Sequence, residues 1–263
     1  MDLTGATCLV TGANRGIGAA LAARLAREPL ATLLLGMRSP GDARPPAATP
    51  GGAAEVRAVR VDLGSRAAID DSWAELDGEP IDLLINNAGQ MTGGLLEEQD
   101  MERMYAMFQV NLVGVAHLTA RVLPGMLARR RGKIVNNASI SGYAHFPAAT
   151  TYAASKAGVV ALTESLRREL RGTGVDVMHL ITPGVATEML DDTESVYGRY
   201  MDTSGWERQE PGAWAEKVVA AIRTDARKLE PGGKIGWAVR AARGPAVLLD
   251  RASARMFSRQ PRR

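Results

Sequence analysis

Six short runs of five to seven residues divide the chain into a regular alternation of predicted strands and helices. Most are continuously apolar, as in a buried strand, and the third alternates apolar and polar positions. They cover residues 6–11, 31–37, 56–61, 81–85, 133–138 and 175–181. Helices are predicted over 19–26, from near 65, over 97–131 with a break near Pro124, over 151–171 and over 211–222. This alternation predicts an α/β fold with a parallel sheet.

A glycine-rich turn joins the first predicted strand to the first predicted helix. It reads Gly-Ala-Asn-Arg-Gly-Ile-Gly over residues 12–18. Glycines permit a tight turn and close backbone approach, and the free N–H groups of a helix N-terminus attract a pyrophosphate. A simple tight connection is the alternative, and the position after the first strand favours the nucleotide. The residues assigned to the nucleotide are Gly12, Asn14, Arg15, Gly16, Ile17 and Gly18.

The end of the second strand bears on the choice of dinucleotide. In a dinucleotide-binding fold this strand end meets the adenosine ribose, and an acidic residue there accepts a hydrogen bond from the 2′-hydroxyl of NAD. This chain has Arg38 and Ser39 instead, and Arg15 adds a second cation. Because cations suit a 2′-phosphate, we expect a preference for NADP(H). The alternative is that Arg38 is a solvated arginine at a strand end.

Small and polar residues follow the third and fourth strands. Asp62 and Leu63 end the third strand, and Asp62 either accepts from an adenine amino group or caps the helix that starts near Ser65. The fourth strand leads into a stretch that suits either close approach of a ribose or a simple turn. That stretch is Asn87, Ala88 and Gly89.

Two polar residues lie inside predicted elements. Asn111 falls within the long helical pattern, where Asn is disfavoured because its side chain competes for backbone groups. A surface Asn with satisfied hydrogen bonds is the simplest interpretation. His179 lies inside the sixth strand and is expected to be buried scaffold rather than a catalytic base.

Tyr152 and Lys156 carry the clearest catalytic pattern. Residues four apart on a helix lie on one face, and a nearby ammonium favours the ionised phenol. We therefore expect Lys156 to lower the pKa of Tyr152 and to make it a proton donor and acceptor. Ser139, at the end of the fifth strand, lies where ligands of open parallel sheets bind. Alone, the Tyr–Lys spacing is also compatible with a solvated helix pair.

Composition and charge narrow the classes of protein further. Hydrophobic residues make up 46% of the 263 residues and charged residues 23%, which suits a globular chain with a sizeable core. No apolar run reaches about eighteen residues, so no transmembrane helix is expected, and the N-terminus lacks a secretory signal. Cys8, the only cysteine, is expected in the core. These features predict a cytoplasmic protein. The net charge of +3 is too small to indicate a broad basic surface for nucleic-acid binding.

Taken together, these motifs resemble the short-chain dehydrogenase/reductase family over roughly residues 4–190. The matches occur in the family's order and spacing. They are Thr11-Gly12-x-x-x-Gly16-Ile17-Gly18, Asp62-Leu63, Asn86-Asn87-Ala88-Gly89, Asn111, Ser139, Tyr152-x-x-x-Lys156 and Pro183-Gly184. The resemblance implies one doubly wound, Rossmann-like domain and reversible hydride transfer between NADP(H) and a secondary alcohol or ketone. It also implies a homodimer or homotetramer.

The resemblance implies a role for each matched position. Tyr152 would be the general acid/base, and Lys156 would lower its pKa and hold the nicotinamide ribose. Ser139 would orient the substrate oxygen, and Asn111 would hold a water in a proton relay. The remaining positions would bind the cofactor: the glycines at the pyrophosphate, Asp62 at the adenine, Asn87 at a ribose, and Pro183, Gly184 and Val185 at the nicotinamide. No residue is assigned to a metal.

Two departures from the family pattern leave questions open. The spacing from Pro183 to Thr187 is one residue shorter than in many members, so a carboxamide contact by Thr187 is in doubt. A short seventh strand is expected near Lys228, followed by a basic extension over 229–263 beside the catalytic domain of residues 1–228. The segment 187–210, expected to be a mobile loop over the substrate, favours a hydrophobic substrate. The alternative class is a catalytically inactive NADP(H)-binding regulatory or scaffold protein.

The basic extension carries a predicted amphipathic helix after Gly244 and Pro245. Residues 223–263 hold eleven Lys or Arg and three Asp or Glu. Trp237, Val239 and Arg240 precede the helix, whose apolar stripe is Leu248, Leu249, Ala252 and Met256, and whose basic stripe is Arg251, Arg255, Arg259 and Arg262. Such a helix either packs on protein or associates weakly with an anionic membrane surface.

Overall fold

One parallel sheet organises the computed structural model, which describes residues 1–47, 49–76, 78–233, 236–237 and 239. In this described part, seven strands lie in the order β3-β2-β1-β4-β5-β6-β7. Their bounds are β1 Thr7–Thr11, β2 Thr32–Met37, β3 Glu55–Arg60, β4 Ile81–Asn86, β5 Gly132–Asn137, β6 Val175–Leu180 and β7 Lys228–Leu229. The order reverses between β1 and β4, so the sheet is doubly wound and the predicted fold class is confirmed.

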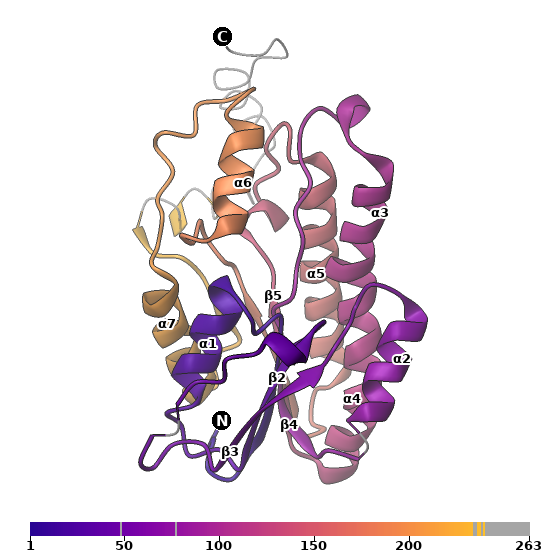
Figure 1. The fold of residues 1–263 in the computed structure, drawn as a ribbon, viewed down its shortest axis with the longest axis vertical. Helices are drawn as coiled ribbons and strands as arrows, with labels where there is room; N and C mark the ends of the chain where they lie inside the picture. Colours follow the sequence, from indigo (N-terminus) through magenta and orange to yellow (C-terminus); the bar gives the residue numbers. More distant parts are fainter. Residues whose placement is uncertain (48, 77, 234–235, 238, 240–263) are drawn as a thin grey trace.

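Helices cover both faces of this sheet. Figure 1 shows α1 and α7 on one side and α2, α3, α4 and α5 on the other, with α6 near the end that carries the carboxyl ends of the strands. The helices are α1 Gly16–Leu25, α2 Arg66–Glu75, α3 Met101–Phe108, α4 Gly114–Arg129, α5 Thr150–Glu169, α6 Glu188–Tyr197 and α7 Pro211–Arg223. Short 3-10 turns η1, η2 and η4 cover Pro40–Asp42, Leu96–Glu98 and Ile140–Gly142.

Alternation along the strands divides the core into two layers. In β1, Cys8 and Val10 join the apolar cluster under α1 and α7, whereas Leu9 joins the cluster under α2, α4 and α5. Successive side chains of a strand point to opposite faces, so a strand covered on both sides must be apolar throughout. Cys8 is a core residue as expected, and burial raises the pKa of its thiol.

The long helical pattern over 97–131 is interrupted, but not at the expected place. Helix α4 continues through Pro124, and the irregularity is a π-helical segment, η3, at Gln109–Val113. The stretch Met101–Arg129 is long and apolar enough to cross a membrane, judged by length and composition alone. Core helices meet the same test, and Leu118, Val122 and Met126 of this stretch pack in the core against the sheet.

The segment 187–210 contains regular structure that the sequence did not reveal. Helix α6 follows directly after Thr187, whose side chain accepts a hydrogen bond from the Leu190 amide at 3.4 Å. Tyr197, Tyr200 and Met201 are buried against the residues before α5. The segment therefore contains a helix that its sequence pattern did not indicate, and three large side chains anchor it. Its movement over a substrate stays a prediction.

The C-terminal extension is described only in part. The short seventh strand is present at Lys228–Leu229, paired with β6, as predicted. The predicted amphipathic helix after Gly244, with both of its stripes, lies outside the described residues. The domain boundary at residue 228 and the membrane contact therefore stay predictions.

Candidate active site

The carboxyl ends of six strands bring the predicted site residues to one edge of the sheet. This follows from the parallel arrangement, in which all strands end on the same side. Within three residues of the ends of β1 to β6, in order, lie Gly12, Arg38, Asp62, Asn87, Ser139 and Pro183. Tyr152 and Lys156 come from the first turns of α5, which starts at the same edge.

Ser139, Tyr152 and Lys156 lie together. The Ser139 hydroxyl accepts a hydrogen bond from the Ser141 amide at 3.1 Å and is close enough to Tyr152 to favour the ionised form of its phenol. Lys156 Nζ is 5.9 Å from the centre of the Tyr152 ring. The structure thus brings three of the four predicted catalytic residues together.

The expected effect of Lys156 on Tyr152 is wrong for this structure. Burial raises the pKa of the Tyr152 phenol above its usual range, and the hydrogen bond with Ser139 opposes this shift. Burial also lowers the pKa of the Lys156 ammonium to about 8. Desolvation disfavours both charged forms and here outweighs their attraction. Tyr152 is therefore a neutral proton donor at neutral pH.

Backbone and side-chain contacts fix the position of Lys156. Its ammonium donates to the Asn137 carbonyl oxygen at 2.9 Å, at the end of β5. A Cβ atom added to Gly89 would lie 3.7 Å from Lys156 Nζ and 3.4 Å from Asn111 Oδ1. Glycine at position 89 therefore leaves space open where these two polar side chains converge.

Asn111 is held in the π-helical segment η3. It is buried, not on the surface as the simplest interpretation expected. Its Oδ1 accepts from the Gln90 amide at 2.8 Å, and its Nδ2 donates to the Gln90 carbonyl at 2.8 Å and to Ser155 Oγ at 3.2 Å. π segments often mark functional sites, and this one joins the β4 loop to α5 through one side chain.

A second polar chain connects the ends of β1, β4, β5 and β6, and the sequence analysis missed it. Thr11 Oγ1 accepts from the Asn87 and Ala88 amides, both at 3.0 Å. Asn137 Nδ2 donates to Asn87 Oδ1 at 3.0 Å, and Thr182 Oγ1 donates to Asn137 Oδ1. Asn is rare inside strands, so the two consecutive Asn residues that end β5 were the sequence feature that could have indicated this hydrogen-bond chain.

The glycine-rich turn fits a pyrophosphate. Gly12 has φ +66°, and a Cβ there would lie 2.9 Å from the Ala88 Cα, so a larger residue would push the turn away from the β4 loop. Arg15 precedes α1 and forms no side-chain cap on its N-terminus. The first N–H groups of α1 are therefore oriented to bind an anion rather than a capping side chain.

The start of α6 lies against the glycine-rich turn. Arg15 Nη1 forms an ion pair with Glu188 Oε2 at 3.0 Å. A Cβ added to Gly16 would lie 3.1 Å from the Thr187 methyl carbon. Thr187 Oγ1 also hydrogen-bonds to the Val185 carbonyl at 3.1 Å. The side chain of Thr187 thus starts α6, and its methyl group faces the turn.

The outer cofactor residues have fewer contacts. Arg38 is exposed. Asp62 Oδ1 accepts from the Gly64 amide at 2.9 Å, whereas Ser65 Oγ caps α2 by accepting from the Ala68 amide at 3.1 Å. The capping alternative for Asp62 is therefore wrong. Leu63 is in the core, Asn14 and Ile17 flank the turn, and Val185 is buried beside Pro183 and Gly184.

The family profile of the short chain dehydrogenases matches residues 6–197. The chain belongs to this family. Its members are oxidoreductases, and the matched stretch contains all the predicted catalytic residues. The family assignment from sequence motifs is thereby confirmed.

Among sequence relatives, a ketoacyl reductase, HetN, of Nostoc sp. is 34% identical over 189 residues. That match covers 71% of this chain and 65% of the relative, slightly less than two thirds of its length. An uncharacterized oxidoreductase of Staphylococcus saprophyticus is 36% identical, over 74% of this chain and 84% of the relative.

Solved structures agree with the fold and hold the expected cofactor type. A Burkholderia cenocepacia short chain dehydrogenase in complex with NADP has a TM-score of 0.80 at 24% identity, over 96% and 99% of the two chains, which supports the fold alone. An actinorhodin polyketide ketoreductase with NADPH has a TM-score of 0.74 at 30% identity, over 88% and 97%.

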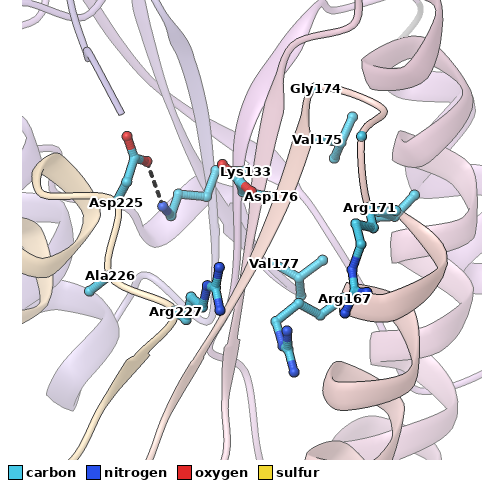
Figure 2. A pocket seen from close by; sticks show the side chains of 12 residues that line it. Lys133, Arg167, Arg171, Gly174, Val175, Asp176, Val177, Asp225, Ala226 and Arg227 are labelled. Carbon is cyan, nitrogen blue, oxygen red and sulfur yellow. Dashed lines mark hydrogen bonds and ion pairs between the residues drawn. The ribbon is translucent and has the colours of Figure 1, made fainter.

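A cavity of about 290 Å³ lies at the opposite edge of the dehydrogenase sheet, at the amino ends of β5 and β6. Figure 2 shows the buried Lys133 pointing across it to Asp225, 2.8 Å from the carboxylate. Arg167, Arg171 and Arg227 also line it. None of the predicted catalytic residues lines this cavity, so it is separate from the candidate active site.

His179 is buried in β6, with its Nε2 3.1 Å from the Tyr143 hydroxyl, as expected for a structural residue.

Proposed function

We propose that this short-chain dehydrogenase transfers hydride reversibly between NADP(H) and a secondary alcohol or ketone, with Tyr152 as the acid/base. The observation that carries the proposal is the convergence of Ser139, Tyr152 and the buried Lys156 at the carboxyl ends of the strands, with Lys156 Nζ 5.9 Å from the centre of the Tyr152 ring. A hydroxyl pair of this kind binds one substrate oxygen from two sides. Named relatives that are ketoacyl and polyketide ketoreductases support the same class of reaction.

The residues that would hold the cofactor are those around the glycine-rich turn and the β4 loop. The N-terminus of α1 would bind the pyrophosphate, and Lys156 and Asn87 would contact ribose hydroxyls. When bound, the nicotinamide supplies or accepts the hydride. Arg38 and Arg15 support a preference for the 2′-phosphate, because a guanidinium pairs with phosphate in two-point geometry. Solved family members with NADP or NADPH support the same choice.

The protein's own part in ketone reduction is to hold the carbonyl and to supply the proton. Ser139 and Tyr152 donate hydrogen bonds to the carbonyl oxygen. As the carbonyl carbon gains the hydride, negative charge grows on this oxygen, and the Tyr152 proton moves onto it. Because burial keeps Tyr152 neutral, the protein is prepared for reduction at neutral pH. A hydrophobic substrate stays part of the proposal, because the segment 187–210 after β6 is rich in apolar and aromatic residues.

The test is NADPH oxidation, followed by absorbance, over a panel of apolar ketones. Wild type should turn over at least one ketone, and Tyr152→Phe should lose two or more orders of magnitude, the usual range for acid–base catalysis. NADPH should still bind to the variant. Tyr105→Phe, at an exposed position on α3, is the matched control and should retain activity. NADPH binding without turnover of any ketone would favour the inactive regulatory or scaffold protein.

The proposed function leaves two predictions about partners to be tested. Size measurements in solution would test the expected homodimer or homotetramer. Co-sedimentation with anionic and neutral vesicles, for the full chain and a version ending at residue 243, would test the membrane contact. Salt-sensitive binding that truncation removes supports the contact, and no binding at low salt refutes it.

A further inference from the structure

Tyr197 has a buried hydroxyl for which the described residues offer no hydrogen-bond partner. It is the last residue of α6, and its side chain is 4% exposed. A buried hydroxyl without a partner costs about 1–3 kcal/mol. Phenylalanine would fill the same space without this cost. The hydroxyl is therefore suited to a hydrogen-bond partner other than the described residues of the chain.

The ring of Tyr197 is clamped between two loops at the catalytic edge. A Cβ added to Gly93, in the loop after β4, would lie 2.4 Å from Tyr197 Cε1 and 3.2 Å from the Ala148 carbonyl. Trp206 meets the ring edge-to-face, with ring centres 5.9 Å apart. Only glycine at position 93 leaves room for this ring, so the phenol has a fixed place.

Tyr197 is also electrostatically coupled to Tyr152. Burial raises the pKa of Tyr197, and the charge that Tyr152 would carry raises it further. Ala148 and Ala149, which pack with Tyr197, immediately precede the helix that carries Tyr152. The unpartnered phenol thus belongs to the same end of the molecule as the acid/base.

We propose that Tyr197 is a substrate-binding residue, whose hydroxyl donates a hydrogen bond to a second oxygen of the ketone that Ser139 and Tyr152 hold. This inference rests on the proposed function and narrows its substrate class to apolar ketones with a second acceptor oxygen. The second oxygen is uncharged, such as a carbonyl or ether. An uncharged oxygen suits this place, because the phenol packs among the apolar residues Ala148, Ala149 and Met201.

The experiment measures wild type and two variants, each with every member of a series of ketones. The series contains medium-chain diketones with one, two or three methylenes between the carbonyls, and the monoketone of equal length. Tyr197→Phe removes only the hydroxyl. Tyr200→Phe is the matched control, because Tyr200 is a buried tyrosine of the same cluster whose hydroxyl donates to Glu98 within the protein. For each pair, kcat/KM with NADPH and the thermal shift caused by the ketone are measured.

The proposal expects one diketone spacing to be preferred by wild type. Tyr197→Phe should lose that preference by about 5- to 100-fold, the range for losing a buried hydrogen bond, and its loss on the monoketone should be clearly smaller. Tyr200→Phe should keep the preference. Equal losses for diketones and monoketone, or no loss for either, would overturn the proposal. If wild type turns over neither class, the proposed function fails, and the thermal shifts still decide whether the diketone is recognised through Tyr197.

Discussion

The two halves of the dehydrogenase site differ in how their side chains are held. In the catalytic half, Ser139, Lys156 and Asn111 are buried and hydrogen-bonded to the protein, and Tyr152 is half-buried. In the adenosine half (Asn14, Arg15 and Arg38), the side chains are exposed. The one ion pair described for Arg15 joins it to Glu188, and both of these side chains are more than two-thirds exposed.

This difference predicts that the buried catalytic half controls reaction rate and stability, whereas the exposed adenosine half controls the choice between NADPH and NADH. Buried groups interact strongly because water does not screen them, so their loss should change rates and stability. Exposed ion pairs contribute about 0–1 kcal/mol and are screened by salt. Changes in the adenosine half should therefore alter cofactor binding while the fold and the chemistry remain.

Lys156→Met should have the largest effect, on the pH dependence of stability. Burial lowers the pKa of folded Lys156 from 10.5 to about 8. Between these values the unfolded chain binds more protons, so wild-type stability rises with pH, by about 3 kcal/mol in total. The contribution is lost as the pH falls through 8. Urea unfolding of both proteins between about pH 7 and 11 measures this, and parallel curves would contradict it.

Arg38→Asp should act on cofactor choice alone. A charge-assisted hydrogen bond contributes about 1.5–3 kcal/mol, so the NADPH-to-NADH ratio of Kd should change by roughly 10- to 150-fold. Unfolding free energy should stay within the error. Arg44→Asp, an exposed position in the following loop, makes the same charge change and controls for long-range effects. A wild type that prefers NADH, or equal effects of both variants, would refute the role of Arg38.

Asn137→Ala tests whether the buried hydrogen-bond chain stabilises the catalytic edge. It leaves Asn87 Oδ1 and Thr182 Oγ1 without their partner, which should lower the unfolding free energy by about 1–3 kcal/mol. Asn14→Ala, the same substitution at an exposed position, should leave it unchanged. Equal unfolding free energies of the two variants in urea would contradict the claim that buried hydrogen bonds stabilise the catalytic half more than the adenosine half.

Glu188→Gln should have the smallest effect. Glu188 competes with a bound phosphate for the Arg15 guanidinium. An exposed ion pair contributes about 0.2–1 kcal/mol, so removing the Glu188 charge should tighten NADPH binding by up to about fivefold. NADH binding should not change. Glu194→Gln removes a charge from the same helix, where Glu194 pairs with Arg208. Identical NADPH affinities of the two variants would show that Arg15 does not contact the phosphate.

The sequence was sufficient for the sheet because its signal is local. Short apolar runs separated by helices predict parallel strands, and all six predicted strands agree with the structure to within one residue. The long helix was less accurate, because a π segment follows from packing at Asn111 rather than from residue type. The 187–210 segment was missed as well, since α6 is stabilised by contacts of Tyr197 and Tyr200 with residues distant in sequence.

The catalytic residues could be predicted from motifs with fixed spacing, whereas properties that depend on burial could not be predicted from the sequence. Ser139, Tyr152 and Lys156 follow from order and spacing along the chain. The direction of the Tyr152 pKa does not, since it depends on desolvation by the whole fold. Asn137 and Tyr197 could not be assigned because their roles depend on partners, present or absent, that only three-dimensional packing defines.

The π segment at Gln109–Val113 has a consequence for insertions and deletions. A π turn accommodates one residue more than an α turn, and each α-helical residue advances by about 100°. Deleting one residue there would remove the wide turn and let α3 and α4 join as a regular helix, with little change in their relative rotation, because the wide turn is what absorbs the extra residue. Asn111 would then turn away from Gln90 and Ser155. Homologous chains that lack this residue would need a different side chain to connect the β4 loop to α5.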